Sequence, residues 1–131
     1  MSFRVTSVDE VPAIPDPDEG LTWHPIRDAL DITAFGTNAY SARVAGDLVV
    51  EPHTEDEFEE LYVVLTGAAR FEVDGEALDA PAGTLVLVTP PSHRVAHAAA
   101  PGTTVLAIGA VPGKAFEVSG WEKRALSERR G

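Results

Sequence analysis

Short apolar runs separated by turn residues dominate the middle of the chain. They predict eight strands, at residues 38–44, 48–51, 60–65, 68–73, 76–79, 84–88, 94–98 and 104–108. Glycine and proline clusters such as Pro81-Ala82-Gly83 and Pro90-Pro91 lie between the runs. Eight short strands with no long helical pattern between them predict an all-β fold, an antiparallel sandwich or barrel.

The dipeptide Asp74-Gly75 predicts a tight hairpin within this region. Phe71 and Val73 precede it in strand-like alternation. Both turn positions accept the positive φ that a type I′ turn requires, so the strands on either side should pair.

The two ends of the chain have a different pattern. Residues 11–20 contain three prolines and no periodicity, which predicts an extended arm, and residues 21–30 predict a strand end followed by one short helical turn. Residues 121–131 predict a short helix with cations near its C-terminal end. This helix is either a docking segment for an acidic partner or a solvated end. We therefore expect an N-terminal arm and lead-in at 1–37, a barrel at 38–112 and a C-terminal tail at 113–131.

Length and composition fit one globular domain. The chain has 131 residues, of which 44% are apolar, and no apolar run approaches the roughly 20 residues that span a membrane. Cysteine is absent, which excludes disulfides and thiolate metal sites. The first residues lack the basic-then-apolar layout of a secretory leader, so we expect a cytoplasmic protein.

The net charge of −11 limits the classes of partner. A field of this sign repels phosphate backbones and anionic lipids, so we expect neither nucleic acid nor membrane as a partner. It tolerates cations and keeps a small domain soluble. A small molecule is the expected partner.

Four side chains form a candidate metal site. His53 and Glu55 are two residues apart, so on a strand they point to the same face. Glu60 opens the apolar run 61–65, and His93 follows a second apolar run and a proline corner. Two imidazoles with one or two carboxylates suit Fe, Mn, Ni or Zn. Glu55 is either a fourth ligand or an acid at the rim of a pocket.

Two neighbours of His93 belong to the same strand. His97 lies four residues after His93 and should share its face, which would let it point inward as an acid–base residue. Arg94 should face the opposite way, so we expect an exterior residue engaged in a salt bridge.

The spacing of these residues resembles the cupin superfamily. Gly46 to Gly67 is similar to the first cupin motif, with His53 at the first histidine position and Glu60 at the glutamate. Gly75, then Pro81-Ala82-Gly83, then His93 resemble the second motif. The resemblance implies a double-stranded β-helix, a jelly-roll-like barrel. It also implies a homodimer, because small cupin barrels commonly pair, and the proline-rich arm could cross to a partner.

The chain departs from the cupin pattern at three places. Glu55 stands at the second histidine position, His97 stands at the asparagine position, and one extra residue separates Gly46 from His53. A carboxylate in place of an imidazole changes the charge of the site and its metal preference. Many cupin relatives have lost their metal, so an empty pocket is also consistent with the motif.

Three function classes follow from this reading. The first is a metal-dependent enzyme on a small organic substrate, such as a dioxygenase, isomerase or decarboxylase, with His53, Glu60 and His93 as ligands. The second is a non-catalytic cupin that binds a small ligand without metal. The third is a structural or oligomerisation module. A fold of this kind hosts many activities, so the sequence assigns no catalytic residue and no organic cofactor.

Overall fold

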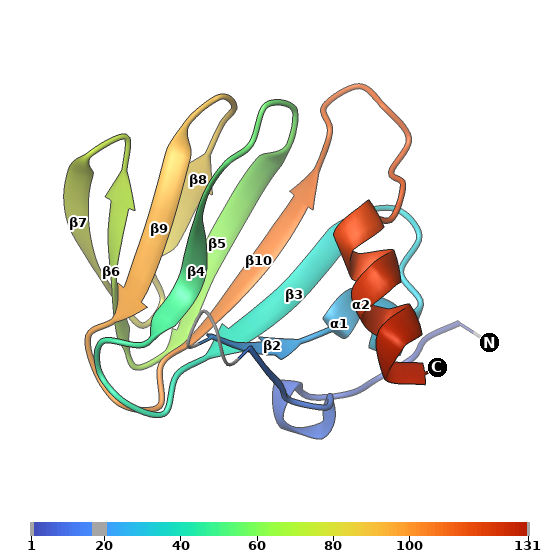
Figure 1. Ribbon diagram of the computed structural model, residues 1–131, viewed down its shortest axis with the longest axis horizontal. Helices are drawn as coiled ribbons and strands as arrows, with labels where there is room; N and C mark the ends of the chain where they lie inside the picture. The colour runs from blue at the N-terminus through green and yellow to red at the C-terminus, as the bar shows by residue number, and fades with distance from the viewer. Residues whose placement is uncertain (1, 17–20, 131) are drawn as a thin grey trace.

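Two antiparallel sheets face each other and form a barrel (Figure 1). The structure is a computed structural model that describes residues 2–16 and 21–130. One sheet has the strand order β1-β2-β3-β10-β5-β8, and the other has the order β4-β9-β6-β7. The strands are β1 (Ile14–Asp16), β2 (Leu21–His24), β3 (Gly36–Ser41), β4 (Leu48–Thr54), β5 (Glu59–Thr66), β6 (Ala68–Val73), β7 (Glu76–Pro81), β8 (Leu85–Val88), β9 (His93–Ala98) and β10 (Thr104–Ala110). The predicted all-β barrel is therefore confirmed.

The eight predicted strands correspond to β3 through β10, with ends that differ by a few residues. The hairpin between β6 and β7 turns at Asp74 and Gly75, whose φ values are 50° and 82°. Both values lie in the left-handed region, as the predicted turn requires. The turn chemistry thus sets the register in which Val73 pairs with Glu76.

The N-terminal part extends the larger sheet. β1 pairs with β2, and β2 pairs with β3, so this segment of the arm lies against its own barrel. The predicted strand end and helical turn are present as β2 and α1 (Ile26–Leu30). A short 3-10 helix, Val8–Glu10, precedes them. Residues 17–20 of the proline-rich arm lie outside the described residues.

The space between the sheets is filled by the inward-facing side chains of alternating strand positions. Val49, Val64, Phe71, Ala96 and Val105 are all fully buried there. Alternation places every second residue of a strand on the same face, and the opposite faces point outward. The same alternation decides which polar residues enter the barrel.

The C-terminal helix α2 (Gly120–Arg130) packs against α1 and β2 (Figure 1). Arg27 of α1 donates from Nε to Glu122 Oε2 at 2.5 Å, and both side chains are nearly inaccessible. The rings of Trp23 and Trp121 lie 5.1 Å apart between centroids. These contacts hold α2 over one end of the barrel. Within the described chain, neither helix has the length and apolar character needed to cross a membrane.

Candidate functional site

A cavity of about 350 Å³ lies at the end of the barrel that α2 covers. Its lining residues come from β3, β4, β5 and β10, from the turn between β4 and β5, and from the start of α2 with the segment before it. Three of the four predicted site residues line it: His53, Glu55 and Glu60. The cavity has the size of a small-molecule site.

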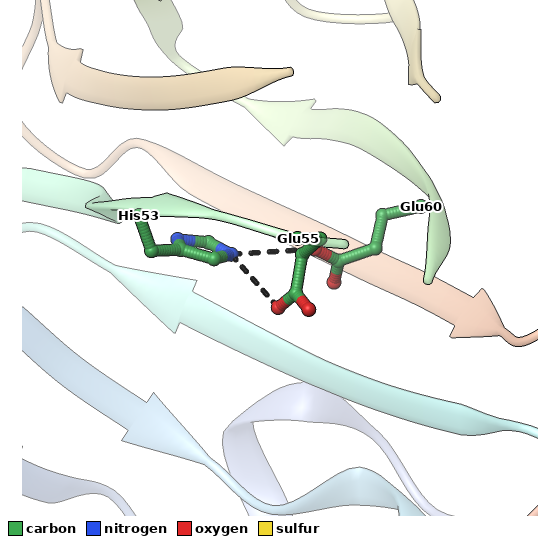
Figure 2. Close-up of side chains that lie close together, drawn as sticks. All are labelled: His53, Glu55 and Glu60. Carbon is green, nitrogen blue, oxygen red and sulfur yellow. Dashed lines mark hydrogen bonds and ion pairs between the residues drawn. The ribbon is translucent and has the colours of Figure 1, made fainter. Parts of the chain in front are cut away.

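His53, Glu55 and Glu60 converge at one wall of this cavity (Figure 2). His53 Nε2 lies 3.3 Å from Glu55 Oε1 and 3.4 Å from Glu60 Oε1. His53 sits near the end of β4, Glu60 is at the start of β5, and Glu55 belongs to the turn between them. The turn thus folds one imidazole and two carboxylates into a single group.

Both ring nitrogens of His53 face oxygen acceptors. Nδ1 lies 2.7 Å from the carbonyl oxygen of Glu51, while Nε2 faces the two carboxylates. A doubly protonated imidazolium satisfies all of these oxygens. Burial opposes that charge, but the hydrogen bonds to Glu55, Glu60 and the Glu51 backbone outweigh it and raise the pKa of His53 to about 10. The ring is therefore a cation at neutral pH.

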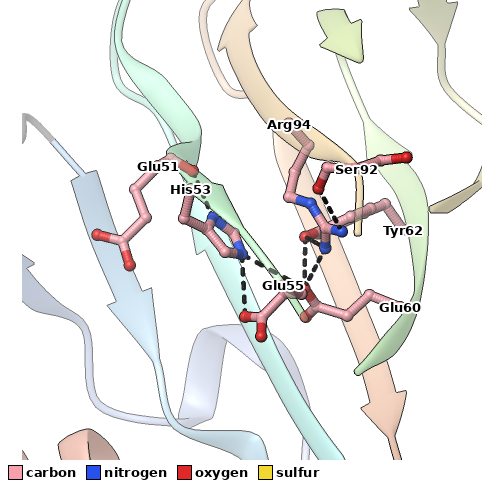
Figure 3. Close-up of polar contacts among 7 residues, drawn as sticks. All are labelled: Glu51, His53, Glu55, Glu60, Tyr62, Ser92 and Arg94. Carbon is pink, nitrogen blue, oxygen red and sulfur yellow. Dashed lines mark hydrogen bonds and ion pairs between the residues drawn. The ribbon is translucent and has the colours of Figure 1, made fainter. Parts of the chain in front are cut away.

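Arg94 occupies the interior next to this group, contrary to the predicted exterior position (Figure 3). Its side chain is fully buried, and Nη1 donates to Glu60 Oε1 at 2.7 Å. Nη1 also lies 3.4 Å from the Tyr62 hydroxyl oxygen, and Nη2 donates to the Ser92 carbonyl at 3.1 Å. In the strand pairing, Arg94 stands opposite His53, which explains why both side chains reach the same site.

Glu60 is the centre of the polar network. Its Oε1 accepts hydrogen bonds from Arg94 at 2.7 Å and from the Tyr62 hydroxyl at 2.9 Å. Burial alone would raise the pKa of Glu60, but the hydrogen bonds from His53 and Tyr62 and the nearby positive charges lower it below its usual value. Burial and the adjacent Glu60 charge raise the pKa of Tyr62, so this phenol stays protonated and donates. Perturbed titratable groups in a cavity are typical of functional sites.

The structure does not bring His93 into the group. His93 is exposed, and its backbone N–H donates to Asp74 Oδ1 at 2.8 Å. His97 is exposed as well, so the two histidines do share a face, but that face is the outer one. The predicted convergence of His93 with His53 and Glu60 is therefore wrong, and an inward role for His97 is wrong too.

Several cavity residues were not singled out from the sequence. Phe116, Trp121 and Glu122 come from the segment read as a tail, and Tyr40 comes from β3. The tail residues carry no strand alternation that could have placed them on an inner face. The packing of α2 onto α1 brings Trp121 and Glu122 to the cavity, and the ring of Phe116 lies beside Gly36 of β3.

The residues present fit a metal ion in spacing but not in charge. Ligand atoms of His53, Glu55 and Glu60 lie within 4.8 Å of one another, so the group can hold an ion. However, an ion at Glu60 would lie beside the permanent charge of Arg94 and would have to displace a proton from His53. Of the predicted ligands, His93 adds no nitrogen here.

Comparison with solved structures defines the class of the fold. A predicted oxalate decarboxylase from Thermotoga maritima superposes with a TM-score of 0.69 at 15% identity, covering 82% of this chain and 99% of that one. A cupin protein from Bacteroides fragilis gives 0.63 at 21% identity, covering 91% and 92%. PAC13 from Streptomyces, a nucleoside dehydratase, gives 0.62 at 15% identity, covering 92% and 88%. At these identities the similarity establishes the cupin fold.

The sequence also matches a family within this fold class. The profile of the AraC-like ligand binding domain matches residues 35–123, which is more than half of the chain. The chain therefore belongs to the AraC-like ligand binding domain family. No curated protein matches the sequence.

Proposed function

We propose that the protein binds a small organic molecule in the barrel cavity without a resident metal ion. The observation that carries this proposal is the contact between Arg94 and Glu60. A buried guanidinium already neutralises the carboxylate that the cupin motif places at the metal position. The sequence kept both a metal-dependent enzyme and a metal-free binder open, and the charge arrangement supports the second.

The polar network gives such a ligand charged hydrogen-bonding partners. His53 and Glu55 are both partly exposed, with 27% and 30% of their side-chain surface accessible. Glu60 retains 18% accessibility on the cavity side of its contact with Arg94. Hydrogen bonds to ionised groups are about twice as strong as neutral ones, so these side chains can orient a polar ligand.

A small-molecule screen with a blocked-cavity variant tests the proposal. Ligand-observed NMR against a library of small metabolites, in EDTA, should find compounds that bind the wild type. Thr54 is exposed and lines the cavity, so Thr54→Trp should narrow the site and abolish binding. Thr89→Trp is the control, because Thr89 is exposed and does not line the cavity. Binding that requires a metal ion, or that survives Thr54→Trp, would refute the proposal.

We also propose that the chain forms a homodimer through the outer face of β5, β8 and β10. Alternate positions of these strands place mainly aliphatic side chains there, with Glu59 at the start of β5 on the same face. The register pairs Leu61 with Leu87 and Val63 with Leu85. Leu85 is 65% exposed and Leu87 is 58% exposed. Neighbouring exposed apolar side chains of this kind mark interaction sites in soluble proteins. Two copies can meet on these leucines, with Glu59 at the end of the contact.

Light scattering tests this assembly. The wild type should be a dimer, and Leu87→Lys should make it a monomer because a charge enters the apolar face. Val44→Lys is the control, since Val44 is 56% exposed and lies outside these strands. A monomeric wild type at all working concentrations would rule out the dimer.

A further inference from the structure

The cavity wall concentrates aromatic rings and carboxylates. The chain has two tryptophans, two tyrosines and five phenylalanines, and five of these nine residues line the cavity: Tyr40, Phe58, Tyr62, Phe116 and Trp121. Four glutamates also line it: Glu51, Glu55, Glu60 and Glu122. Among the described residues, the lining contains neither lysine nor arginine, although the chain has ten. This composition is far from that of the chain as a whole.

The phenol of Tyr40 reports the sign of the electrostatic potential at this wall. Burial is the main reason that the pKa of Tyr40 is raised. The further contributions come from the charges of the same four glutamates, and all of them act in the same direction. The wall around Tyr40 is therefore a region of negative potential.

The charged side chains that line the cavity are mostly acidic. Four of them are the glutamates named above, and one is His53. Arg94 contacts Glu60 from behind the wall, and Arg27 contacts Glu122. Among the described residues, the charged groups that a ligand can meet at the wall itself are therefore four carboxylates and one imidazole ring.

One polar side chain of the lining lacks a hydrogen-bond partner. Thr37 is only 5% exposed, and its Oγ1 has no partner among the described residues. Buried polar atoms are nearly always hydrogen-bonded in native proteins. Because Thr37 belongs to the cavity lining, a ligand polar group can supply the missing bond.

We propose that the ligand of this cavity is a small organic cation of the ammonium type with a polar substituent. The aromatic rings would hold the cation through cation–π contacts, the carboxylates would supply the opposite charge, and Thr37 would bond the substituent. Rings around a quaternary or protonated amine are an established use of such contacts in proteins. The inference rests on the proposed small-molecule site and specifies the charge of its ligand.

A matched pair of probes isolates the effect of charge. Choline and 3,3-dimethyl-1-butanol have the same shape and hydroxyl group, but the alcohol carries a neutral carbon in place of the ammonium nitrogen. Calorimetric titration of the full chain with each probe, in EDTA at pH 7, should show choline binding about tenfold more tightly or better. Phe58→Leu should weaken choline binding and leave the alcohol unaffected. Phe35→Leu is the control, because Phe35 is exposed and outside the lining.

The outcomes separate this inference from the proposed site. If the alcohol binds as tightly as choline, or if neutral or anionic library compounds bind where choline does not, the cation inference is wrong and the small-molecule site stands. If no compound of any charge binds the wild type, both are wrong. If choline binds and Thr54→Trp does not weaken it, choline binds elsewhere and the inference fails.

Discussion

Arg94 Nη1 lies 2.7 Å from Glu60 Oε1, and this contact joins β9 of one sheet to β5 of the other across the barrel interior. The Arg94 side chain has no accessible surface, whereas Glu60 keeps 18%. The arginine therefore lies behind the cavity wall, and the glutamate is the member of the pair that a ligand can reach. The same ion pair connects the two sheets and neutralises Glu60, so its loss should change both the stability of the barrel and the charge of the site.

Removing the guanidinium should destabilise the fold strongly. In Arg94→Met, Glu60 would remain largely buried without its cation, and breaking a buried ion pair typically costs about 3–5 kcal/mol of unfolding free energy. Urea denaturation measures the loss. Arg70→Met is the matched control, because the Arg70 and Asp79 side chains are 63% and 82% exposed and such pairs contribute less than about 1 kcal/mol. Equal effects of the two substitutions would contradict the interior role of Arg94.

His53 should make stability depend on pH in the alkaline range. Its pKa is raised from 6.5 to about 10 in the fold, so the folded state holds a proton that the unfolded state releases above pH 6.5. The stabilisation that protonated His53 adds to the fold is complete below about pH 6.5 and is lost as pH rises through about 10. NMR titration should show the raised pKa directly, and Glu60→Gln should lower it.

The matched variant for this pH dependence is His53→Gln, which lacks the titrating ring. Between pH 6.5 and 10, the unfolding free energy of this variant should fall less than that of the wild type. A wild-type His53 that titrates near 6.5 would contradict the imidazolium assignment.

Gly67, the glycine that ends the first cupin-like motif, should resist substitution. Its φ is +71°, and an added Cβ would lie 2.7 Å from Thr103 Cα. Gly75→Ala is a control for the backbone strain alone, since Gly75 has φ +82° and open space around the added atom. Thermal denaturation should show Gly67→Ala to be less stable than Gly75→Ala by more than about 1 kcal/mol, because overpacking adds a cost of that size. Equal losses would mean that the Thr103 backbone yields freely.

The attachment of α2 should depend on Arg27. Arg27→Met leaves Glu122 buried without its partner, so α2 should detach more often and its amide hydrogens should exchange faster. Hydrogen exchange read by mass spectrometry measures this effect. Lys114→Met removes an ion pair whose two side chains are 66% and 64% exposed, and it should leave the exchange of α2 unchanged. Unchanged exchange in Arg27→Met would show that the Trp23–Trp121 contact holds the helix by itself.

The strands could be predicted from the sequence because alternation and turn residues act locally. The eight runs between residues 38 and 110 and the Asp74-Gly75 hairpin depend on neighbouring residues only. The position of α2 could not be predicted in this way. It depends on Arg27 and Glu122, which are far apart in sequence and meet only after folding.

The prediction from sequence was wrong about which face of β9 points into the barrel. His93 and Arg94 are adjacent, so a choice of face for one reverses the other. The larger apolar residue Val95 shares the parity of His93 and favours an inward His93. In the structure the small residues Ala96 and Ala98 face inward, at 0% and 4% exposure, and Arg94 shares their parity. The buried guanidinium of Arg94 is held by Glu60 of the facing sheet, and no local sequence pattern indicates this contact.

Metal analysis of protein purified without a histidine tag tests the metal-free site most directly. Elemental analysis should find no stoichiometric metal in the wild type, and titration with Mn²⁺, Fe²⁺, Ni²⁺ and Zn²⁺ should show no saturable binding at neutral pH, because Arg94 and protonated His53 already balance Glu60 and Glu55. Glu60→Gln is the control for any binding observed. One equivalent of a divalent ion in the wild type, lost in Glu60→Gln, would contradict a metal-free site and restore the metal-dependent alternative.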